Sequence, residues 1–247
     1  MPIVDVRGIP SYHEIAGSGG PVLLLHGGFC SLETMRTLQE LLASSYAVHA
    51  PERPGHGRTP DRPGPISYAG GVLDTLAYLD AVGLDSVHVV GFSDGAIIGL
   101  LLALGHPSRV RSLVSISANL DPDCFVADGE AGPDARPDAD RERADYVALS
   151  PDGPDHVDEV LAKLGTLWTT EPQIAPASLA TVTAPTLVMA ADRDVIAHEH
   201  TLTIFRAIPG ARLAVVPGTS HLLVGERPDL VGDLVHDFLA RHDPAGA

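Results

Sequence analysis

The stretch that decides the fold is VHVVGFSDGAIIG, residues 87–99, where an apolar run passes through a Gly-x-Ser-x-Gly pentapeptide into a second apolar segment. The first segment predicts a buried strand and the second predicts a helix. A strand-to-helix turn this sharp brings the backbone on either side of Ser93 into contact, which leaves no room for a Cβ atom at Gly91 or Gly95. The turn is expected to hold the Ser93 hydroxyl at the end of the sheet, where the N-terminus of the helix stabilises negative charge.

Strand and helix patterns alternate on both sides of this stretch. Continuous apolar runs, typical of strands buried on both faces, predict strands at 22–26, 46–50, 86–91, 110–116, 185–190 and 212–216, with weaker ones at 3–6 and 10–15. Helical periodicity predicts helices at 32–44, 68–82, 94–104, 199–207 and 228–241. This alternation favours an α/β fold, a mostly parallel sheet with helices on both faces, in which the first two strands could form an antiparallel edge.

The alternation breaks at residues 121–184, which we interpret as an insertion into a core formed by residues 1–120 and 185–247. The insertion holds 14 acidic and 4 basic residues, so it carries −10 of the formal charge of −16. Its first part, 121–145, is rich in Asp, Pro, Gly and Ala, a composition typical of a mobile loop. Its second part has helical spacing at 156–168 and is expected to cover apolar surface.

Composition restricts the class of partner. The 247 residues include 32 Asp and Glu against 16 Lys and Arg, a balance that disfavours nucleic acid and anionic membranes. Two cysteines are too few for a disulfide framework or a cysteine zinc site. The N-terminal residues lack the pattern of a secretory signal, and the longest apolar run is too short to span a bilayer, so we expect a soluble cytoplasmic protein. We expect a small-molecule substrate, while the oligomeric state is not predictable from the sequence.

A nucleophilic serine needs a base, and an imidazole base needs a carboxylate to orient it. The predicted strand at 185–190 is followed by Asp192 and Asp194, and the strand at 212–216 is followed by His221. Taken alone, Asp194 could cap a following helix and His221 could be a surface residue. Coincidence is a poor explanation for three such residues at carboxyl ends of strands, although the spacing does not choose between the two aspartates.

At this point the chain resembles the α/β-hydrolase fold superfamily over nearly all of its length. The matching stretches are Leu25–Gly28, Arg53–Thr59, Gly91–Gly95, Ala191–Asp194 and Pro217–His221. The resemblance implies an α/β-hydrolase fold with an inserted helical cap at 121–184. It also implies that Ser93 is the nucleophile, His221 the general base and Asp194 the orienting carboxylate, with Asp192 a structural loop acid.

A tetrahedral intermediate further needs two backbone N–H donors, an oxyanion hole. By resemblance one is the N–H of Asp94, and the other is that of Gly28 or, as second choice, Phe29. Asp94 has two interpretations: it stabilises the start of the helix, or it faces the acyl pocket and favours cationic substrates. The pentapeptide also resembles the nucleophile turn of valacyclovirase-like hydrolases, which have Asp after the serine and accept amino-acid esters.

The substrate pocket and the cofactor requirement are less clearly marked. Cys30, Phe125 and Trp168 are candidate pocket residues, although each is also explained by packing. His198 and His200 are expected to point to different sides of a helix, which disfavours a metal site. We expect no metal and no organic cofactor.

These observations predict a serine hydrolase that cleaves a carboxylic ester, lactone or thioester of a neutral or cationic small molecule through an acyl-serine intermediate. A cofactor-free perhydrolase or a carbon–carbon bond hydrolase with the same three residues is an alternative. A ligand-binding signalling protein on a hydrolase fold is another, because one fold serves many functions.

Overall fold

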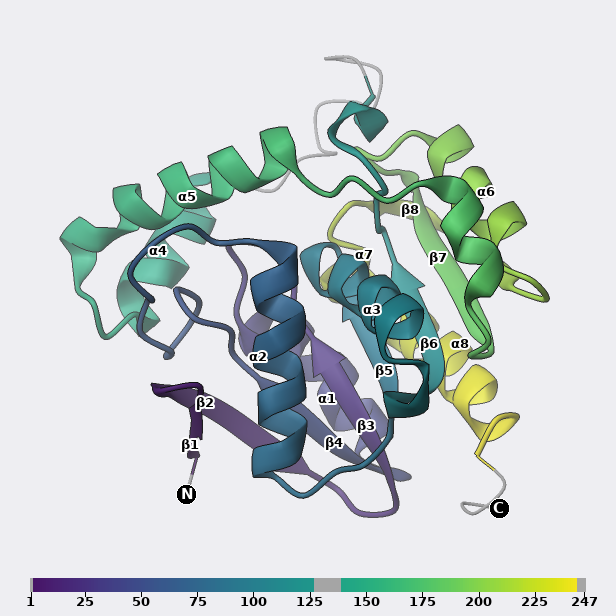
Figure 1. Cartoon of the computed structure of the whole chain (residues 1–247), viewed down its shortest axis with the longest axis horizontal. Coiled ribbons are helices and arrows are strands. Elements are labelled where there is room, and N and C mark those ends of the chain that lie inside the picture. The colour runs from purple at the N-terminus through teal and green to yellow at the C-terminus, as the bar shows by residue number, and fades with distance from the viewer. Residues whose placement is uncertain (1, 127–138, 244–247) are drawn as a thin grey trace.

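A mixed eight-stranded sheet organises the described part of the chain. The computed structural model describes residues 2–126 and 139–243, and Figure 1 shows the sheet running between two layers of helices. The strands are β1 (Ile3–Val6), β2 (Ile9–Ala16), β3 (Gly20–Leu25), β4 (Tyr46–Pro51), β5 (Val87–Phe92), β6 (Val110–Ile116), β7 (Thr186–Arg193) and β8 (Arg212–Ser220). Their order is β1-β2-β4-β3-β5-β6-β7-β8. Strands β1 and β2 pair antiparallel and β3 to β8 run parallel, which confirms the predicted α/β fold and its antiparallel edge.

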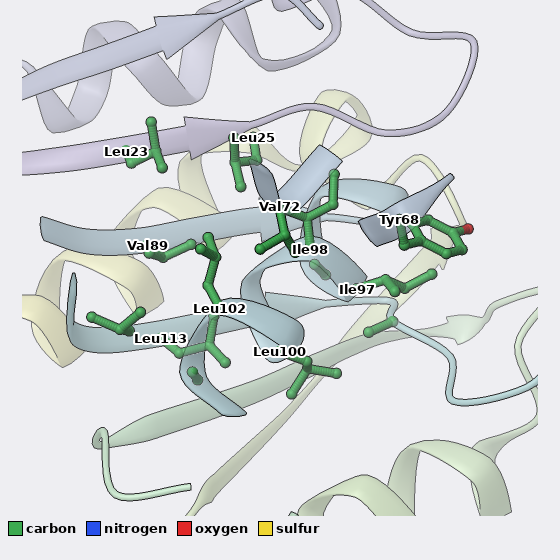
Figure 2. Close-up of a cluster of buried hydrophobic side chains, with 14 of the residues drawn as sticks. Leu23, Leu25, Tyr68, Val72, Val89, Ile97, Ile98, Leu100, Leu102 and Leu113 are labelled. Atoms are coloured by element: carbon green, nitrogen blue, oxygen red, sulfur yellow. The ribbon is translucent and has the colours of Figure 1, made fainter. Parts of the chain in front are cut away.

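Helices cover both faces of this sheet. They are α1 (Arg36–Leu42), α2 (Tyr68–Ala81), α3 (Asp94–Gly105), α6 (His198–Ala207), the short α7 (Leu223–Glu226) and α8 (Pro228–Ala240). The core of one face joins α1 and α8 to side chains such as Val22 and Leu24. The core of the other joins α2 and α3 to Leu23 and Leu25, and Figure 2 shows this second cluster. Alternate residues of β3 therefore enter opposite cores, which is why the strand is a continuous apolar run.

In its described residues, the insertion between β6 and β7 contains two α-helices, α4 (Ala139–Leu149) and α5 (Val157–Thr170), and three short 3-10 helices at Pro122–Cys124, Pro154–His156 and Pro176–Thr181. Figure 1 shows α4 and α5 side by side at one flank of the molecule. The prediction of a loop over 121–145 is wrong for residues 139–145, which are helical, and its residues 127–138 lie outside the described ones. Two acids in the first turn, Asp140 and Glu142, suit the positive end of a helix, so a composition typical of loops also fits a helix start. In the described residues, no helix is long and apolar enough to cross a membrane.

Candidate active site

The turn between β5 and α3 places Ser93 at the N-terminus of the helix. Ser93 has φ 53° and ψ −119°, in the left-handed region of φ that side-chain-bearing residues rarely adopt. A Cβ atom on Gly91 would overlap the carbonyl of Gly95, and one on Gly95 would overlap the carbonyl of Leu25. This confirms the predicted lack of space. The Ser93 N–H donates to the carbonyl of Ile116 at 2.8 Å, which ties the turn to β6.

Ser93, Asp194 and His221, which follow β5, β7 and β8, are joined by hydrogen bonds. His221 Nε2 lies 3.0 Å from Ser93 Oγ, and His221 Nδ1 lies 2.7 Å from Asp194 Oδ1. Asp194 is only 3% exposed, and its carboxylate also accepts from the hydroxyl of Ser117 at 2.5 Å and the N–H of Ile196 at 3.2 Å. The carboxylate therefore holds one edge of the imidazole while the other edge faces the serine.

Electrostatics couple the histidine and the aspartate. Burial lowers the pKa of His221, but the Asp194 carboxylate, helped by Asp94 and Glu142, outweighs burial and leaves this pKa above its ordinary 6.5. Burial raises the pKa of Asp194, but His221 and the donors Ser117 and Ile196 outweigh it, so the pKa lies below 3.8. The arrangement stabilises an imidazolium, which is what a general base becomes when it accepts a proton.

Asp192 does not take part in the hydrogen bonds that join Ser93, His221 and Asp194. Its carboxylate accepts from the N–H groups of Gly218 at 2.8 Å and Thr219 at 3.0 Å, which join the ends of β7 and β8. The same two N–H groups lower the pKa of Asp192. Asp194 and not Asp192 therefore contacts His221, a choice that the sequence spacing left open.

The loop after β3 supplies backbone N–H groups beside the serine. Gly28 lies against the first turn of α3, because a Cβ atom on it would overlap the Asp94 carboxylate. Phe29 has φ 50°, and its buried ring stacks on Tyr146 of α4 with centroids 5.5 Å apart. Among the described hydrogen bonds, none uses the N–H of Gly28, Phe29 or Asp94.

Residues 22–234 match the family model described as the alpha/beta hydrolase family. The chain belongs to the alpha/beta hydrolase family. It is 29% identical to a putative carbamate hydrolase, RutD, of Azorhizobium caulinodans over 98% of this chain and 100% of the relative. It is 37% identical to a 2-hydroxy-6-oxo-2,4-heptadienoate hydrolase of Pseudomonas putida over 47% of this chain and 44% of the relative. The solved structure of Est816, described as an N-acyl homoserine lactone degrading enzyme, superposes with a TM-score of 0.78 at 23% identity over 96% of this chain and 100% of that one, which shows the shared fold.

The Asp94 side chain forms hydrogen bonds with both the core and the insertion of this alpha/beta hydrolase. Its carboxylate is 4% exposed and accepts from the hydroxyl of Tyr68 at 2.9 Å and the indole N–H of Trp168 at 3.2 Å. The Tyr68 hydroxyl stays protonated and can donate, because burial and the Asp94 carboxylate raise its pKa. With these two donors in place, Asp94 is better explained as a structural acceptor than as a free partner for a cationic substrate.

The three candidate pocket residues lie in different surroundings. Cys30 lines a cavity of about 440 Å³ bounded by the loop after β3, α4 and α7, and burial raises the pKa of its thiol to about 12, so it stays protonated. Trp168 lies over Gly28. Phe125 is 45% exposed, pairs through its backbone with Ile196 and lines neither this cavity nor a smaller one beside Asp94.

Other polar groups complete the surroundings of the site. Among the described residues, Asp61, His156 and Glu159 lie close enough to share a metal ion, but the ammonium of Lys163 already contacts both carboxylates. His198 bonds to a backbone carbonyl and His200 accepts from a backbone N–H. Two groups near the site, Ser117 and the side chain of Arg53, were not predicted from the sequence. Nothing in the pattern of β6 marks Ser117, whereas Arg53 lies in one of the motifs that carried the family resemblance.

Proposed function

We propose that this alpha/beta hydrolase cleaves a carboxylic ester, lactone or thioester of a neutral or cationic small molecule through an acyl-Ser93 intermediate. The observation that carries the proposal is the hydrogen-bonded chain from Ser93 through His221 to the buried Asp194, with contacts of 3.0 and 2.7 Å. Three side chains from distant parts of the sequence rarely take this order without a catalytic role.

The proposed reaction follows from the roles of these atoms. Ser93 Oγ attacks the substrate carbonyl while His221 Nε2 accepts its proton, and Asp194 stabilises the imidazolium. We expect the N–H groups of Asp94 and of Gly28 or Phe29 to stabilise the oxyanion that forms. The tetrahedral intermediate collapses, and His221 returns the proton to the leaving alcohol or thiol. His221 then takes a proton from water, whose oxygen attacks the acyl carbon. When this second intermediate collapses, the bond to Ser93 Oγ breaks, His221 returns the proton to Oγ and the acid is released.

We further infer that residues 121–184 act as a cap on a core formed by 1–120 and 185–247. Supporting contacts come from both helices of the insertion: Tyr146 of α4 stacks on Phe29, and Trp168 of α5 donates to Asp94. The cavity of about 440 Å³ is the proposed substrate pocket, although its lining residues include neither Ser93 nor His221. Its walls include Phe29 and Leu222, which directly follow Gly28 and His221 in the chain.

Carbamate hydrolysis is the second candidate, because a relative that aligns with 98% of this chain is named a putative carbamate hydrolase. Attack on a carbamate carbonyl uses the same nucleophile, base and oxyanion donors. Parallel assays on a p-nitrophenyl ester, a γ-lactone and an N-methyl carbamate of the same phenol separate the candidates by their kcat/KM values.

A serine-reactive fluorophosphonate and a Ser93→Ala variant test the proposal. We expect the reagent to label Ser93 alone, and the variant to lose at least about 10³-fold in kcat on p-nitrophenyl butyrate while retaining its unfolding midpoint. Ser108→Ala is the matched control, since Ser108 is exposed and lies after α3, away from the site. A pure Ser93→Ala protein with wild-type turnover, or labelling of another residue, would contradict the proposed mechanism.

A further inference from the structure

Arg53 forms a closed ring of hydrogen bonds with the loop that carries the proposed oxyanion donors. Its guanidinium Nη2 donates to the carbonyl of Gly27 at 2.7 Å. His26 Nδ1 lies 2.8 Å from the same carbonyl, and the backbone N–H of Arg53 donates to His26 Nε2 at 3.2 Å. Because Nε2 accepts, Nδ1 carries the proton of a neutral ring and donates to Gly27. Two side-chain donors therefore converge on one carbonyl oxygen.

Only one of these two donors is charged. Burial, with Arg53 and His56 adding to it, keeps the pKa of His26 far below 6.5, so the ring stays neutral. Burial also lowers the pKa of Arg53, partly offset by the Asp94 carboxylate, but a guanidinium remains protonated at any pH at which the protein is folded. The bond from Arg53 to Gly27 is thus charge-assisted, and such bonds are shorter and stronger than neutral ones.

The carbonyl of Gly27 and the N–H of Gly28 belong to one peptide unit. In a planar trans peptide the two groups point in opposite directions, so a partner that fixes the carbonyl also fixes the direction of the N–H. A positive charge at the carbonyl oxygen polarises the peptide and makes its N–H a better donor. Gly28 itself lies against Asp94 and Trp168, directly beside the turn that carries Ser93.

We propose that Arg53 is a positioning residue of the oxyanion hole, which holds the Gly27 carbonyl so that the Gly28 N–H faces the acyl oxygen of a substrate on Ser93. The inference rests on the proposed hydrolase function and adds a residue that does not itself touch the substrate. Since an oxyanion develops only in the transition state, loss of Arg53 should lower kcat with little effect on KM.

The test compares Arg53→Met and Arg53→Lys with the matched control Arg62→Met. Arg62 and Arg53 both line the smaller cavity beside Asp94. The guanidinium of Arg62, however, donates to Asp74 and to the carbonyl of Val6 and not to the loop after β3. On p-nitrophenyl butyrate we expect Arg53→Met to lower kcat about 10- to 100-fold with KM within about 3-fold of wild type. Arg53→Lys should recover part of the loss, and the control should stay within about 3-fold of wild type.

Two further readouts separate positioning from general stability. Affinity for a trifluoromethyl ketone, which forms a tetrahedral oxyanion on Ser93, should fall in parallel with kcat/KM, while affinity for the product butyrate should not. The ¹⁵N and ¹H shifts of Gly28 should move in Arg53→Met and not in Arg62→Met. If Arg53→Met does not fold, Arg53→Lys carries the same comparisons.

The outcomes distinguish the two proposals. Wild-type kcat and trifluoromethyl ketone affinity in folded Arg53 variants of an enzyme whose Ser93 is labelled by fluorophosphonate would overturn the role of Arg53 alone. Failure of the reagent to label Ser93 in the wild type would overturn the proposed function and the oxyanion hole with it. Equal losses in kcat and in butyrate affinity would show a merely structural role and would also overturn the inference.

Discussion

At the scale of single residues, the site is distinguished by what surrounds each ionisable group. Asp194 and Asp192 are two positions apart, yet Asp194 is buried beside His221 while Asp192 is exposed and holds two backbone N–H groups. Because the pKa of His221 is raised by one of these acids and not by the other, the pH dependence of the reaction can identify the partner.

We predict that Asp194→Asn moves the acid limb of the pH profile to lower pH. His221 must be neutral to accept a proton, so kcat/KM should rise with pH through a value above 6.5 in the wild type. Removing the carboxylate leaves burial to lower this pKa, and we also expect kcat to fall about 10³- to 10⁴-fold. The measurement is kcat/KM for p-nitrophenyl butyrate from pH 5 to about 9, the range in which histidine titrates.

The control for this prediction is Asp192→Asn, which should leave the midpoint of the acid limb unchanged. An unchanged midpoint in Asp194→Asn, or the same displacement in both variants, would contradict the assignment of Asp194 as the partner of His221.

At the scale of elements, the turn between β5 and α3 joins fold and site. The α3 helix packs against both β5 and β6, and Gly95 in its first turn contacts the carbonyl end of β3 so closely that a Cβ atom has no space. At the far end of the same helix, Gly105 has nothing within 4 Å of its Cβ position. Gly95 and Gly105 of the same helix therefore differ in the space around them.

We predict that Gly95→Ala destabilises the protein by about 2 kcal/mol or more, because α3 must move away from the end of β3. The movement should also displace Ser93 and slow fluorophosphonate labelling at least about 10-fold. Gly105→Ala should be neutral or stabilising by up to about 1 kcal/mol. Denaturant unfolding gives both free energies, and similar values for the two variants would show that the turn tolerates a Cβ atom.

At the scale of the whole molecule, polar contacts hold the acidic insertion against the core. Asp61 of the core lies 2.9 Å from His156 Nε2 and contacts the ammonium of Lys163, while its backbone N–H donates to Asp152 at 2.7 Å. The wall of the larger cavity includes Glu142 and Asp145 of the insertion and Glu33 and Glu226 of the core, against one basic residue, Arg141, so its formal charge is negative. A field of this sign attracts cations and repels anions at the entrance.

We predict that added salt lowers kcat/KM for a cationic p-nitrophenyl ester and leaves that for a neutral ester of the same shape unchanged. Salt shortens the distance over which charges act from about 30 Å at 0.01 M to about 3 Å at 1 M, which removes the attraction. The double variant Glu142→Gln/Asp145→Asn should show a smaller salt effect, and Glu40→Gln, an exposed acid on α1, should show the wild-type effect. Equal salt responses of the two esters would contradict the attraction of cationic substrates and would leave solubility as the role of the acidic residues.

Much of the architecture was predictable because it rests on local patterns. Every predicted strand corresponds to an observed one within a few residues. Burial on both faces explains the apolar runs of β3 to β7, whereas β8 was predicted to be buried in the same way and is mostly exposed, because it is the edge strand of the sheet. The helix α4 was not predictable, because its own apolar spacing is weak and its burial depends on the stack of Tyr146 on Phe29, more than 100 residues away in the chain. The short α7 helix was missed because four residues carry no period.

The sequence by itself determined the order along the chain of the strands and of the described α-helices other than α4 and α7, the sharp turn at Ser93 and the placement of Ser93, Asp194 and His221 at strand ends. Apolar periodicity and glycine sterics act over a few residues, so they can be seen in the chain. Only the tertiary structure decided that Asp194 contacts His221, that Tyr68 and Trp168 satisfy Asp94, and that Arg53 reaches the Gly27 carbonyl. Each of these contacts joins residues at least 26 positions apart, and no local pattern encodes which distant polar groups will meet.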